Sequence, residues 1–227
     1  MKRSTIRLNM EFKDRIPVDL ISGFRGAGKT TLIRAMTDMW QEDRVVFLQN
    51  EQGKESFPGF EGNETFAVVP LTGGCLCCTA NSQLEQTLLE RKENFSPTRI
   101  VLELAETARL SDVKANFAQF PDYRIEHIIY VLNACDFQKK WHLSKRFLEQ
   151  QFAETPVLYI NRIDQTADSV PEAIYAAIAA NNPKCKIYED GANLEELYHT
   201  SRTFKQITIT GKQQGARSAA RPPLITF

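Results

Sequence analysis

What the sequence lacks narrows its possible roles. No run approaches the roughly 20 apolar residues of a membrane-spanning helix, and the basic start MKRSTIRLNMEFKDR contains no apolar segment of a secretion signal. The chain also has no net charge, because 28 Lys and Arg balance 28 Asp and Glu. An overall field that attracts nucleic acid or an anionic membrane is therefore absent. We expect a cytoplasmic protein whose partners include neither nucleic acid nor membrane.

Cysteine is scarce and unevenly distributed. The chain has five cysteines, an odd number for a disulfide framework, and three of them fall within four positions at Cys75, Cys77 and Cys78. In a reducing cytosol such a cluster indicates thiol or metal chemistry. Cys135 and Cys185 lie in or beside apolar strands, and there we expect core residues. The three histidines are scattered, which is typical of surface or core residues rather than of metal ligands.

The pattern of apolar runs predicts the fold class. The 227 residues suit one domain with a sizeable core. Apolar runs alternate with helical patterns, which is typical of an α/β fold with a mostly parallel sheet and helices on both faces. The predicted strands are 16–22, 44–49, 66–71, 99–104, 125–132, 157–160 and 184–188. Predicted helices are 81–91, 137–152 and 171–180, together with one that follows the first strand.

A glycine-rich segment lies between that first strand and its helix. It reads GFRGAGKT from Gly23 to Thr30, the G-x-x-x-x-G-K-[ST] pattern of a phosphate-binding loop. Such a loop turns backbone N–H groups towards phosphate oxygens at a helix N-terminus. The alternative, a glycine-rich turn with a chance lysine, does not explain the flanking strand and helix. The segment therefore predicts a three-layer P-loop NTPase fold.

Each polar residue of the loop has an expected role. Lys29 reaches the β and γ phosphates, and Thr30 places its hydroxyl on Mg²⁺, which bridges the same two phosphates. Thr31 lies nearer the α phosphate. The residues expected to contact the nucleotide here are Gly23, Gly26, Ala27, Gly28, Lys29, Thr30 and Thr31.

A second motif follows the predicted strand 157–160. Asn161, Arg162 and Asp164 lie in the segment NRID, where a P-loop GTPase has an N-K-x-D motif. A carboxylate at the last position can accept the ring N–H and the exocyclic amine of guanine, whereas adenine presents no such pair. Arginine keeps a long stem but differs from lysine in geometry. The alternative is that Asp164 caps a helix.

Three thiolates at C-x-C-C spacing can bind one soft or borderline metal ion. Gly73 and Gly74 allow a turn that brings Cys75, Cys77 and Cys78 together, with a fourth position open. An open site can exchange its metal, whereas a closed four-cysteine site is structural. The alternatives are cysteines packed as small hydrophobic residues and a reversible disulfide.

Four ordered segments resemble those of a known family. They are GFRGAGKTTLI, NEQG, GGCLCCT and NRID, and they run from about residue 18 to residue 164. They are similar to the phosphate loop, N-E-F-G segment, C-x-C-C signature and guanine motif of the metal-handling P-loop GTPases. That group includes HypB and UreG, and the likeness is to its CobW-like metallochaperone branch.

This resemblance implies a function and further site residues. The expected protein binds GTP or GDP with Mg²⁺, holds Zn²⁺ or Co²⁺, and delivers the metal to a client metalloprotein or corrinoid-dependent protein. Its relatives often couple dimerisation to the nucleotide, so a nucleotide-dependent homodimer is expected. Glu51 of NEQG is the candidate oxygen ligand of the transition metal. Glu103, at the place of the family's E-x-x-G, is expected near Mg²⁺ and joins Lys29 and Thr30 as the catalytic set.

Three positions depart from the family pattern. Glu106 replaces the glycine of E-x-x-G, Pro58 stands where an aspartate is expected, and Asn133 replaces the aspartate of V-V-D-A. These changes predict GTP hydrolysis that is slow or needs a partner, because charge and positioning supply most phosphoryl-transfer catalysis. Two alternatives are a hydrolysis-deficient regulatory module and a P-loop kinase or ATPase, and NRID argues against the latter.

The expected domain organisation is a single GTPase domain over residues 1–203. Residues 204–227 then form a basic tail, because the chain has no acidic residue after Glu196. A short strand is expected in FKQITIT, residues 204–210. The second domain that often follows in CobW-like proteins is expected to be absent.

Overall fold

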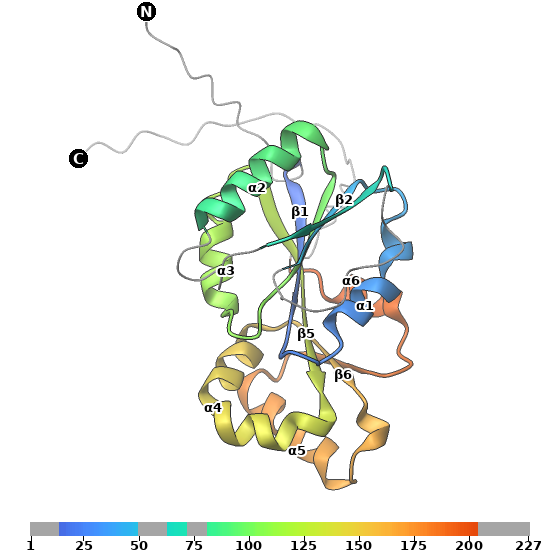
Figure 1. The fold of residues 1–227 in the computed structure, drawn as a ribbon. Helices are drawn as coiled ribbons and strands as arrows, with labels where there is room; N and C mark the ends of the chain where they lie inside the picture. Colours follow the sequence, from blue (N-terminus) through green and yellow to red (C-terminus); the bar gives the residue numbers. More distant parts are fainter. Residues whose placement is uncertain (1–13, 50–62, 72–80, 204–227) are drawn as a thin grey trace, which may run out of the picture.

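A computed structural model describes residues 14–49, 63–71 and 81–203. A seven-stranded sheet lies at its centre, in the order β3-β2-β4-β1-β5-β6-β7 (Figure 1). Each neighbouring pair of these strands is parallel. The strands are β1 Ile16–Ser22, β2 Val45–Gln49, β3 Phe66–Pro70, β4 Arg99–Glu103, β5 Tyr123–Asn133, β6 Val157–Asn161 and β7 Lys186–Glu189.

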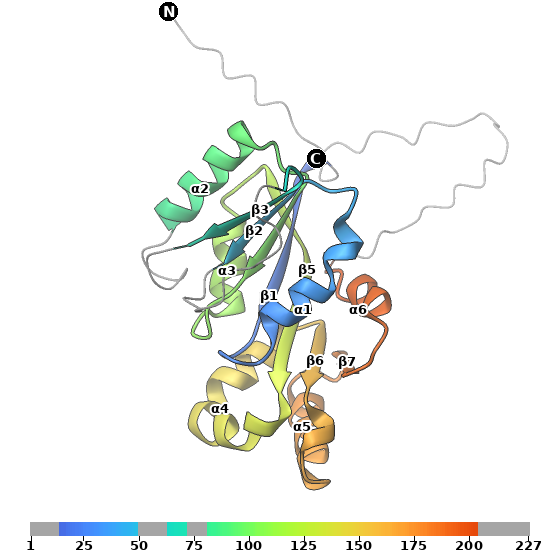
Figure 2. The ribbon, with the colours of Figure 1, turned by 45° about the vertical axis from the view of Figure 1, so that its right-hand side comes forward.

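Helices cover both faces of the sheet. One face packs against α1 and α6, and the other packs against α2, α3, α4 and α5. Figure 2 shows α2 and α3 on one side of the strands and α1 and α6 on the other. None of the helices in the described residues is long and apolar enough to cross a membrane. The helices are α1 Lys29–Ala35, α2 Asn81–Asn94, α3 Leu110–Phe117, α4 Phe137–Glu154, α5 Ser169–Asn181 and α6 Leu194–Thr200.

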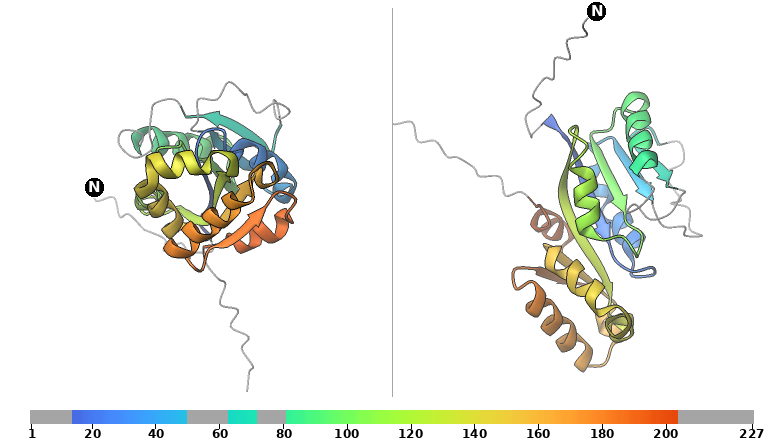
Figure 3. Two further views of the ribbon diagram at one scale, coloured as in Figure 1. Left: turned by 90° about the horizontal axis from the view of Figure 1, so that it is seen from below. Right: turned by 90° about the vertical axis from the view of Figure 1, so that its left-hand side faces the viewer.

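Strands covered on both faces explain the continuous apolar runs of the sequence. In β1 the last five residues are buried, and in β5 the last eight are buried. Alternate residues of these strands face opposite helical layers, so both sets must be apolar. Helices α4 and α5 pack together against β5 and β6, and both lie at the lower end of the molecule in the right-hand view of Figure 3. The predicted α/β sheet with helices on both faces is confirmed.

Two helices were absent from the sequence prediction. The first, α3, has Leu110, Val113 and Phe117 buried at helical spacing on one face, a signal that was present but short. The second, α6, begins after Asn193, whose side chain accepts hydrogen bonds from the backbone N–H groups of Glu195 and Glu196. That cap is a recognisable helix start. Both helices span only seven or eight residues, which leaves little periodicity to detect.

A buried polar network joins α6 to the sheet. The Asp19 carboxylate accepts hydrogen bonds from the Tyr198 hydroxyl at 2.5 Å and from the Arg99 guanidinium at 3.0 Å. Tyr198 in turn accepts one from the Trp40 indole at 3.0 Å. Burial raises the pKa of Asp19 to about 6, although Arg99 and Tyr198 act in the opposite direction. The network therefore ties β1 and β4 to the last helix described.

His127 lies beside this network and has no solvent exposure. Its ring stacks on Tyr198 with the centroids 3.9 Å apart, and its Nδ1 lies 2.9 Å from Ser201 Oγ. Ser201 already donates its hydroxyl hydrogen to the Tyr198 carbonyl. Nδ1 must therefore be the donor to Ser201, which requires an Nδ1–H tautomer. Burial, followed by nearby Arg99, lowers the pKa of His127 to about 3.

Candidate nucleotide-binding site

The glycine-rich segment forms a tight loop between β1 and α1. Gly23 and Gly28 have φ angles of +139° and +103°, which side-chain-bearing residues rarely adopt. A Cβ atom at Gly23 would lie 2.2 Å from the Val131 carbonyl oxygen of β5. The glycines are therefore required both by the backbone conformation and by the close approach of β5.

Lys29 is the first residue of α1 and is 2% exposed. Its Nζ donates hydrogen bonds to the carbonyl oxygens of Gly23 at 3.0 Å and Phe24 at 3.1 Å. The ammonium group thus lies inside the curve of the loop. A cation held there by backbone carbonyls is available to anionic oxygens that enter the loop.

Thr30 and Glu103 meet at the carboxyl end of β4. Thr30 Oγ1 lies 3.0 Å and 3.2 Å from the two carboxylate oxygens of Glu103, which is fully buried. Lys29 Nζ is 4.0 Å from the same carboxylate. A hydroxyl and a carboxylate are oxygen ligands of the kind that Mg²⁺ prefers. The residues present therefore fit a magnesium ion.

Glu106 points towards the phosphate loop rather than away from it. Its Oε2 accepts a hydrogen bond from the backbone N–H of Arg25 at 3.2 Å. Arg25 is the third residue of the glycine-rich loop, so this bond ties Glu106 to the backbone of that loop. The departure at Glu106 thus places a second carboxylate directly on this loop.

The NRID segment contacts the phosphate loop although 134 residues separate them. Asn161 Nδ2 donates a hydrogen bond to the Ala27 carbonyl oxygen at 2.9 Å. A Cβ atom at Gly28 would lie 2.3 Å from the same nitrogen. Asn161 ends β6, two strands away from β1, which carries the loop. The structure therefore brings together the two segments that were interpreted as the phosphate and base motifs.

The backbone at Arg162 is unusual. Its φ of +61° is one of two positive values among the non-glycine residues that the structure describes. Its N–H donates a short hydrogen bond to the Asp190 carboxylate, which also accepts one from the Tyr159 hydroxyl at 3.0 Å. Asp190 follows β7 and was missed by the sequence prediction, since no motif distinguishes it. It fixes the turn that presents the NRID side chains.

Asp164 does not cap a helix, contrary to the alternative considered for it. It is exposed within the short 3-10 helix η4, Ile163–Gln165, and α5 begins only at Ser169. Its carboxylate makes no hydrogen bond or ion pair with any residue that the structure describes. An exposed carboxylate in this position is free to meet a ligand.

The predicted transition-metal ligands lie outside the described residues. These are Cys75, Cys77, Cys78 and Glu51, and Pro58 lies outside as well. Within residues 14–49, 63–71 and 81–203, no three His, Cys, Asp or Glu side chains gather as a metal site. The transition-metal site therefore stays a prediction. The predicted tail 204–227, with the strand expected within it, is likewise outside the described chain.

The expectation that Cys135 is a core residue was wrong. Cys135 is exposed, and Cys185 is only partly buried. The apolar run of β5 ends at Asn133, and Cys135 lies in the 3-10 helix η3, Ala134–Asp136, that follows it. The Asn133 side chain accepts a hydrogen bond from the Cys135 N–H at 3.0 Å and caps this turn. Asn133 thus has a structural role in the place of the expected aspartate.

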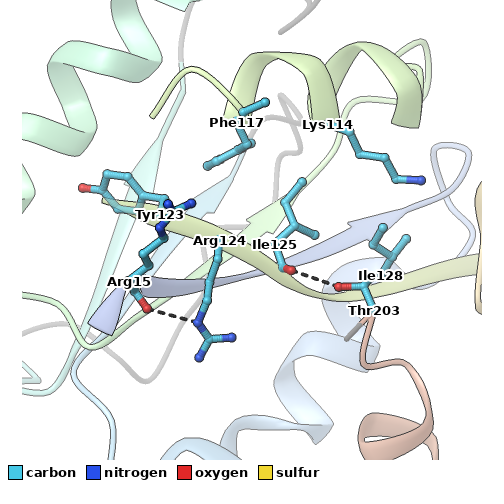
Figure 4. Close-up of a pocket in the computed structure, with 9 residues that line it drawn as sticks. Arg15, Lys114, Phe117, Tyr123, Arg124, Ile125, Ile128 and Thr203 are labelled. Carbon is cyan, nitrogen blue, oxygen red and sulfur yellow. Dashed lines mark hydrogen bonds between the residues drawn. The ribbon is translucent and has the colours of Figure 1, made fainter. Parts of the chain in front are cut away.

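A cavity of about 280 Å³ lies away from the loop, beside the start of β5. Figure 4 shows Phe117 and Lys114 of α3 above it, and the dashed lines join Arg124 to the Arg15 carbonyl and Thr203 to the Ile125 carbonyl. Arg124 and Lys114 form ion pairs with Glu126 and Glu154. Two of the basic side chains at this cavity therefore already have acidic partners.

Comparison with known proteins gives one consistent answer. A sequence model of the family described as CobW/HypB/UreG, nucleotide-binding domain, matches residues 17–189. The zinc chaperone YjiA of Escherichia coli (strain K12) is 26% identical over 186 residues, which make up 76% of this chain and 57% of YjiA. The zinc-regulated GTPase metalloprotein activator 1 of Schizosaccharomyces pombe is 25% identical over 190 residues, or 78% of this chain and 46% of the relative.

A solved structure agrees on the fold. The Zn(II)-bound YjiA GTPase from E. coli superposes with a TM-score of 0.62 at 17% identity, over 89% of this chain and 67% of that chain. This likeness confirms the predicted three-layer P-loop NTPase fold. The chain spans about half the length of the curated relatives it matches.

Proposed function

Because this chain belongs to the CobW/HypB/UreG family of nucleotide-binding domains, we propose that it is a GTP-dependent metallochaperone. It binds GTP or GDP and couples the nucleotide to the binding and delivery of a transition metal, Zn²⁺ or Co²⁺. Its client is a metalloprotein or a corrinoid-dependent protein. The names of two relatives, a zinc chaperone and a zinc-regulated GTPase metalloprotein activator, support this proposal.

The contact between Asn161 and Ala27 carries the nucleotide half of the proposal. It joins NRID to the phosphate loop at 2.9 Å, as one ligand with a base and phosphates requires. Gly23, Gly26, Ala27, Gly28 and Thr31 supply the loop, and Arg162 and Asp164 face the guanine. Lys29 then neutralises phosphate oxygens at the inside of the curve.

Mg²⁺ fits the oxygen atoms that Thr30 and Glu103 present. The bound ion supplies positive charge for the β and γ phosphates. Glu103 is held in place by its burial and by Thr30. These two residues and Lys29 form the proposed catalytic set of a GTPase.

Hydrolysis by this chain is proposed to be slow or partner-activated. The Glu106 carboxylate bonds to a loop amide, and a negative charge there disfavours the charge that develops on the transferring phosphoryl group. Asn133 has an amide in place of the expected carboxylate, and its side chain caps η3. A partner that repositions Glu106 would raise the rate.

The metal half of the proposal rests on thiolate chemistry. Cys75, Cys77 and Cys78 bind a borderline ion such as Zn²⁺ or Co²⁺, and Glu51 adds an oxygen ligand. The incomplete shell leaves one position for a water or for a ligand from the client. A homodimer that forms with the nucleotide is a further proposed state of the protein, and the cytoplasm is its proposed location.

Metal titration tests the coupling. Reduced protein is titrated with Co²⁺ with and without GTP and Mg²⁺, and thiolate-to-metal absorption is followed while Zn²⁺ competes. We expect an affinity that depends on the nucleotide and is lost in Cys77→Ala. Cys135→Ala is the matched control, because this exposed thiol lies outside the predicted cluster. Tight binding that ignores the nucleotide would indicate a structural metal site and contradict the proposal.

The contact of Glu106 with the loop favours one second candidate. In a hydrolysis-deficient regulatory module, the protein binds a nucleotide and a partner but does not turn over. A multiple-turnover GTP assay with and without metal separates the two candidates. Turnover that stops when Lys29 is replaced supports a GTPase, and unchanged GTP over many hours supports the regulatory module.

A further inference from the structure

We propose that Glu106 makes the site select the nucleoside diphosphate over the triphosphate. The carboxylate acts as an internal anion on the phosphate loop and competes with the terminal phosphate of GTP. This inference rests on the proposed function in one respect, namely that the loop binds a guanine nucleotide. It adds a nucleotide preference and names the residue that sets it.

The contact itself is the first step. Glu106 Oε2 accepts the backbone N–H of Arg25 at 3.2 Å across 81 residues of sequence. Loop amides of this kind bind phosphate oxygens through the same N–H···O⁻ interaction. The Glu106 carboxylate therefore places a negative charge against the backbone of the loop that is proposed to hold the phosphates. Glu106 is half-buried and Arg25 is exposed, so solvent screens the charge of the carboxylate only in part.

The position of Glu106 identifies the phosphates with which it competes. Glu103, three residues earlier, bonds to Thr30 at 3.0 Å. The hydroxyl at this position of a phosphate loop binds the Mg²⁺ that bridges the β and γ phosphates. Glu106 reaches the loop from the same segment after β4, so its carboxylate lies at the terminal-phosphate end of the site.

Charge then decides between the two nucleotides. The γ phosphate brings additional negative charge towards a fixed carboxylate, and like charges in close contact repel strongly where solvent screening is incomplete. GDP lacks that phosphate and leaves the bond between Glu106 and Arg25 in place. GTP must break this bond or tolerate the repulsion, so its affinity falls relative to that of GDP.

The Glu106 side chain has one other available role, which would have the opposite effect on GTP binding. A carboxylate near Mg²⁺ can bind the ion and thereby favour GTP. The two roles predict opposite signs when the charge is removed. A charge-neutral variant therefore decides between them without any measurement of catalysis.

The test is equilibrium binding of fluorescent GDP and of a fluorescent, non-hydrolysable GTP analogue at fixed Mg²⁺. The proteins are wild type, Glu106→Gln, Glu106→Gly and the control Glu42→Gln. Gln keeps the length of the side chain and removes its charge, and Gly removes both. Glu42 is exposed and precedes β2, at the opposite end of the strands from the loop, so its replacement changes net charge equally without touching the site. Thermal unfolding of each variant confirms that it is folded.

We expect wild type to bind GDP at least about tenfold more tightly than the GTP analogue. In Glu106→Gly this preference falls about tenfold, through tighter binding of the analogue with GDP affinity nearly unchanged. Glu106→Gln gives an intermediate preference, and Glu42→Gln matches wild type.

An unchanged ratio in both Glu106 variants, or weaker binding of the GTP analogue, would overturn the inference and leave guanine nucleotide binding intact. Failure of all four folded proteins to bind either nucleotide would instead remove the proposed function, and the inference with it. The two failures are therefore distinguishable.

Discussion

The glycine-rich loop and the buried network under α6 use similar charged residues in different ways. At the carboxyl ends of β1 and β4, Lys29 bonds to loop carbonyls and Glu106 bonds to a loop amide. Both are interactions that an incoming phosphate and metal can replace. On the face covered by α6, the Asp19 carboxylate is bonded to Arg99 and Tyr198 with no exposure to solvent. Charge held by exchangeable backbone partners suits a ligand site, whereas charge held by buried side chains suits a fixed support.

Breaking the buried network around Asp19 should give the largest change in stability. Asp19→Ala leaves Arg99 with Asp43 at 2.7 Å and Glu126 at 3.8 Å but without its fully buried partner, and it removes the acceptor of the Tyr198 hydroxyl. Breaking a buried ion pair costs about 3 to 5 kcal/mol, and the two remaining carboxylates place the expected loss at the lower end, about 3 kcal/mol. Urea unfolding at pH 7.5 measures the free energy of unfolding.

Asp19→Asn is the matched control, because its amide oxygen still accepts from Tyr198. It should lose less stability than Asp19→Ala. In both folded variants, GDP affinity should stay within about twofold of wild type, because distant sites are nearly independent. A large loss of GDP affinity in Asp19→Ala would show that the buried network and the loop are coupled, and would contradict the comparison.

A change at Lys29 in the glycine-rich loop should instead lower nucleotide affinity more than stability. Lys29→Met keeps most of the buried stem but removes the ammonium group from the curve of the loop. We expect nucleotide affinity to fall about 100-fold, equal to about 2.7 kcal/mol, because a buried cation that pairs with phosphate is lost. Stability should fall less than in Asp19→Ala, because the buried Glu103 carboxylate loses Lys29 at 4.0 Å but keeps its hydrogen bond from Thr30 at 3.0 Å. Isothermal titration and urea unfolding on the same samples measure both quantities, and a stability loss near that of Asp19→Ala would refute the distinction.

The loop and the buried network also differed in how well the sequence predicted them. The phosphate loop is encoded within eight consecutive residues, so its glycines and Lys29 could be recognised without the fold. The strand that precedes it was predicted as 16–22 and found at Ile16–Ser22. By contrast, Asp19 and Tyr198 are 179 positions apart. Only the packing of α6 onto the sheet brings them together, and α6 itself was not predicted.

Within the candidate site, the sequence predicted which residue types are present better than it predicted where their side chains point. It identified Glu106 as a departure but left open whether the carboxylate faced the loop, because that depends on how the segment after β4 turns. Asp190 could not be predicted, since its role follows from the placement of β7 beside β6. The roles of Cys75, Cys77 and Cys78 stay predictions.

The last predicted effect, about 1.4 kcal/mol per pH unit, sharpens the comparison through a change of pH. His127 is buried against Tyr198, with Arg99, Arg202 and His199 as its charged or titratable neighbours. Its pKa is lowered from 6.5 to about 3, so below pH 6.5 the unfolded chain binds a proton that the folded chain does not. This group therefore destabilises the fold as pH falls, by about 1.4 kcal/mol per pH unit between about pH 6 and pH 4.

His127→Asn isolates that contribution, because its amide can still donate to Ser201 but does not titrate. Asp19, whose pKa is raised to about 6, gives a slope of the opposite sign in both proteins, so it cancels when one is subtracted from the other. We expect the stability of wild type relative to the variant to fall by about 1.4 kcal/mol for each unit from pH 6 to pH 4. Urea unfolding at pH 7, 6, 5 and 4 measures the difference, and parallel profiles would mean that His127 gains a proton without leaving its site. In that case the face under α6 would have more freedom to rearrange than its buried hydrogen bonds imply.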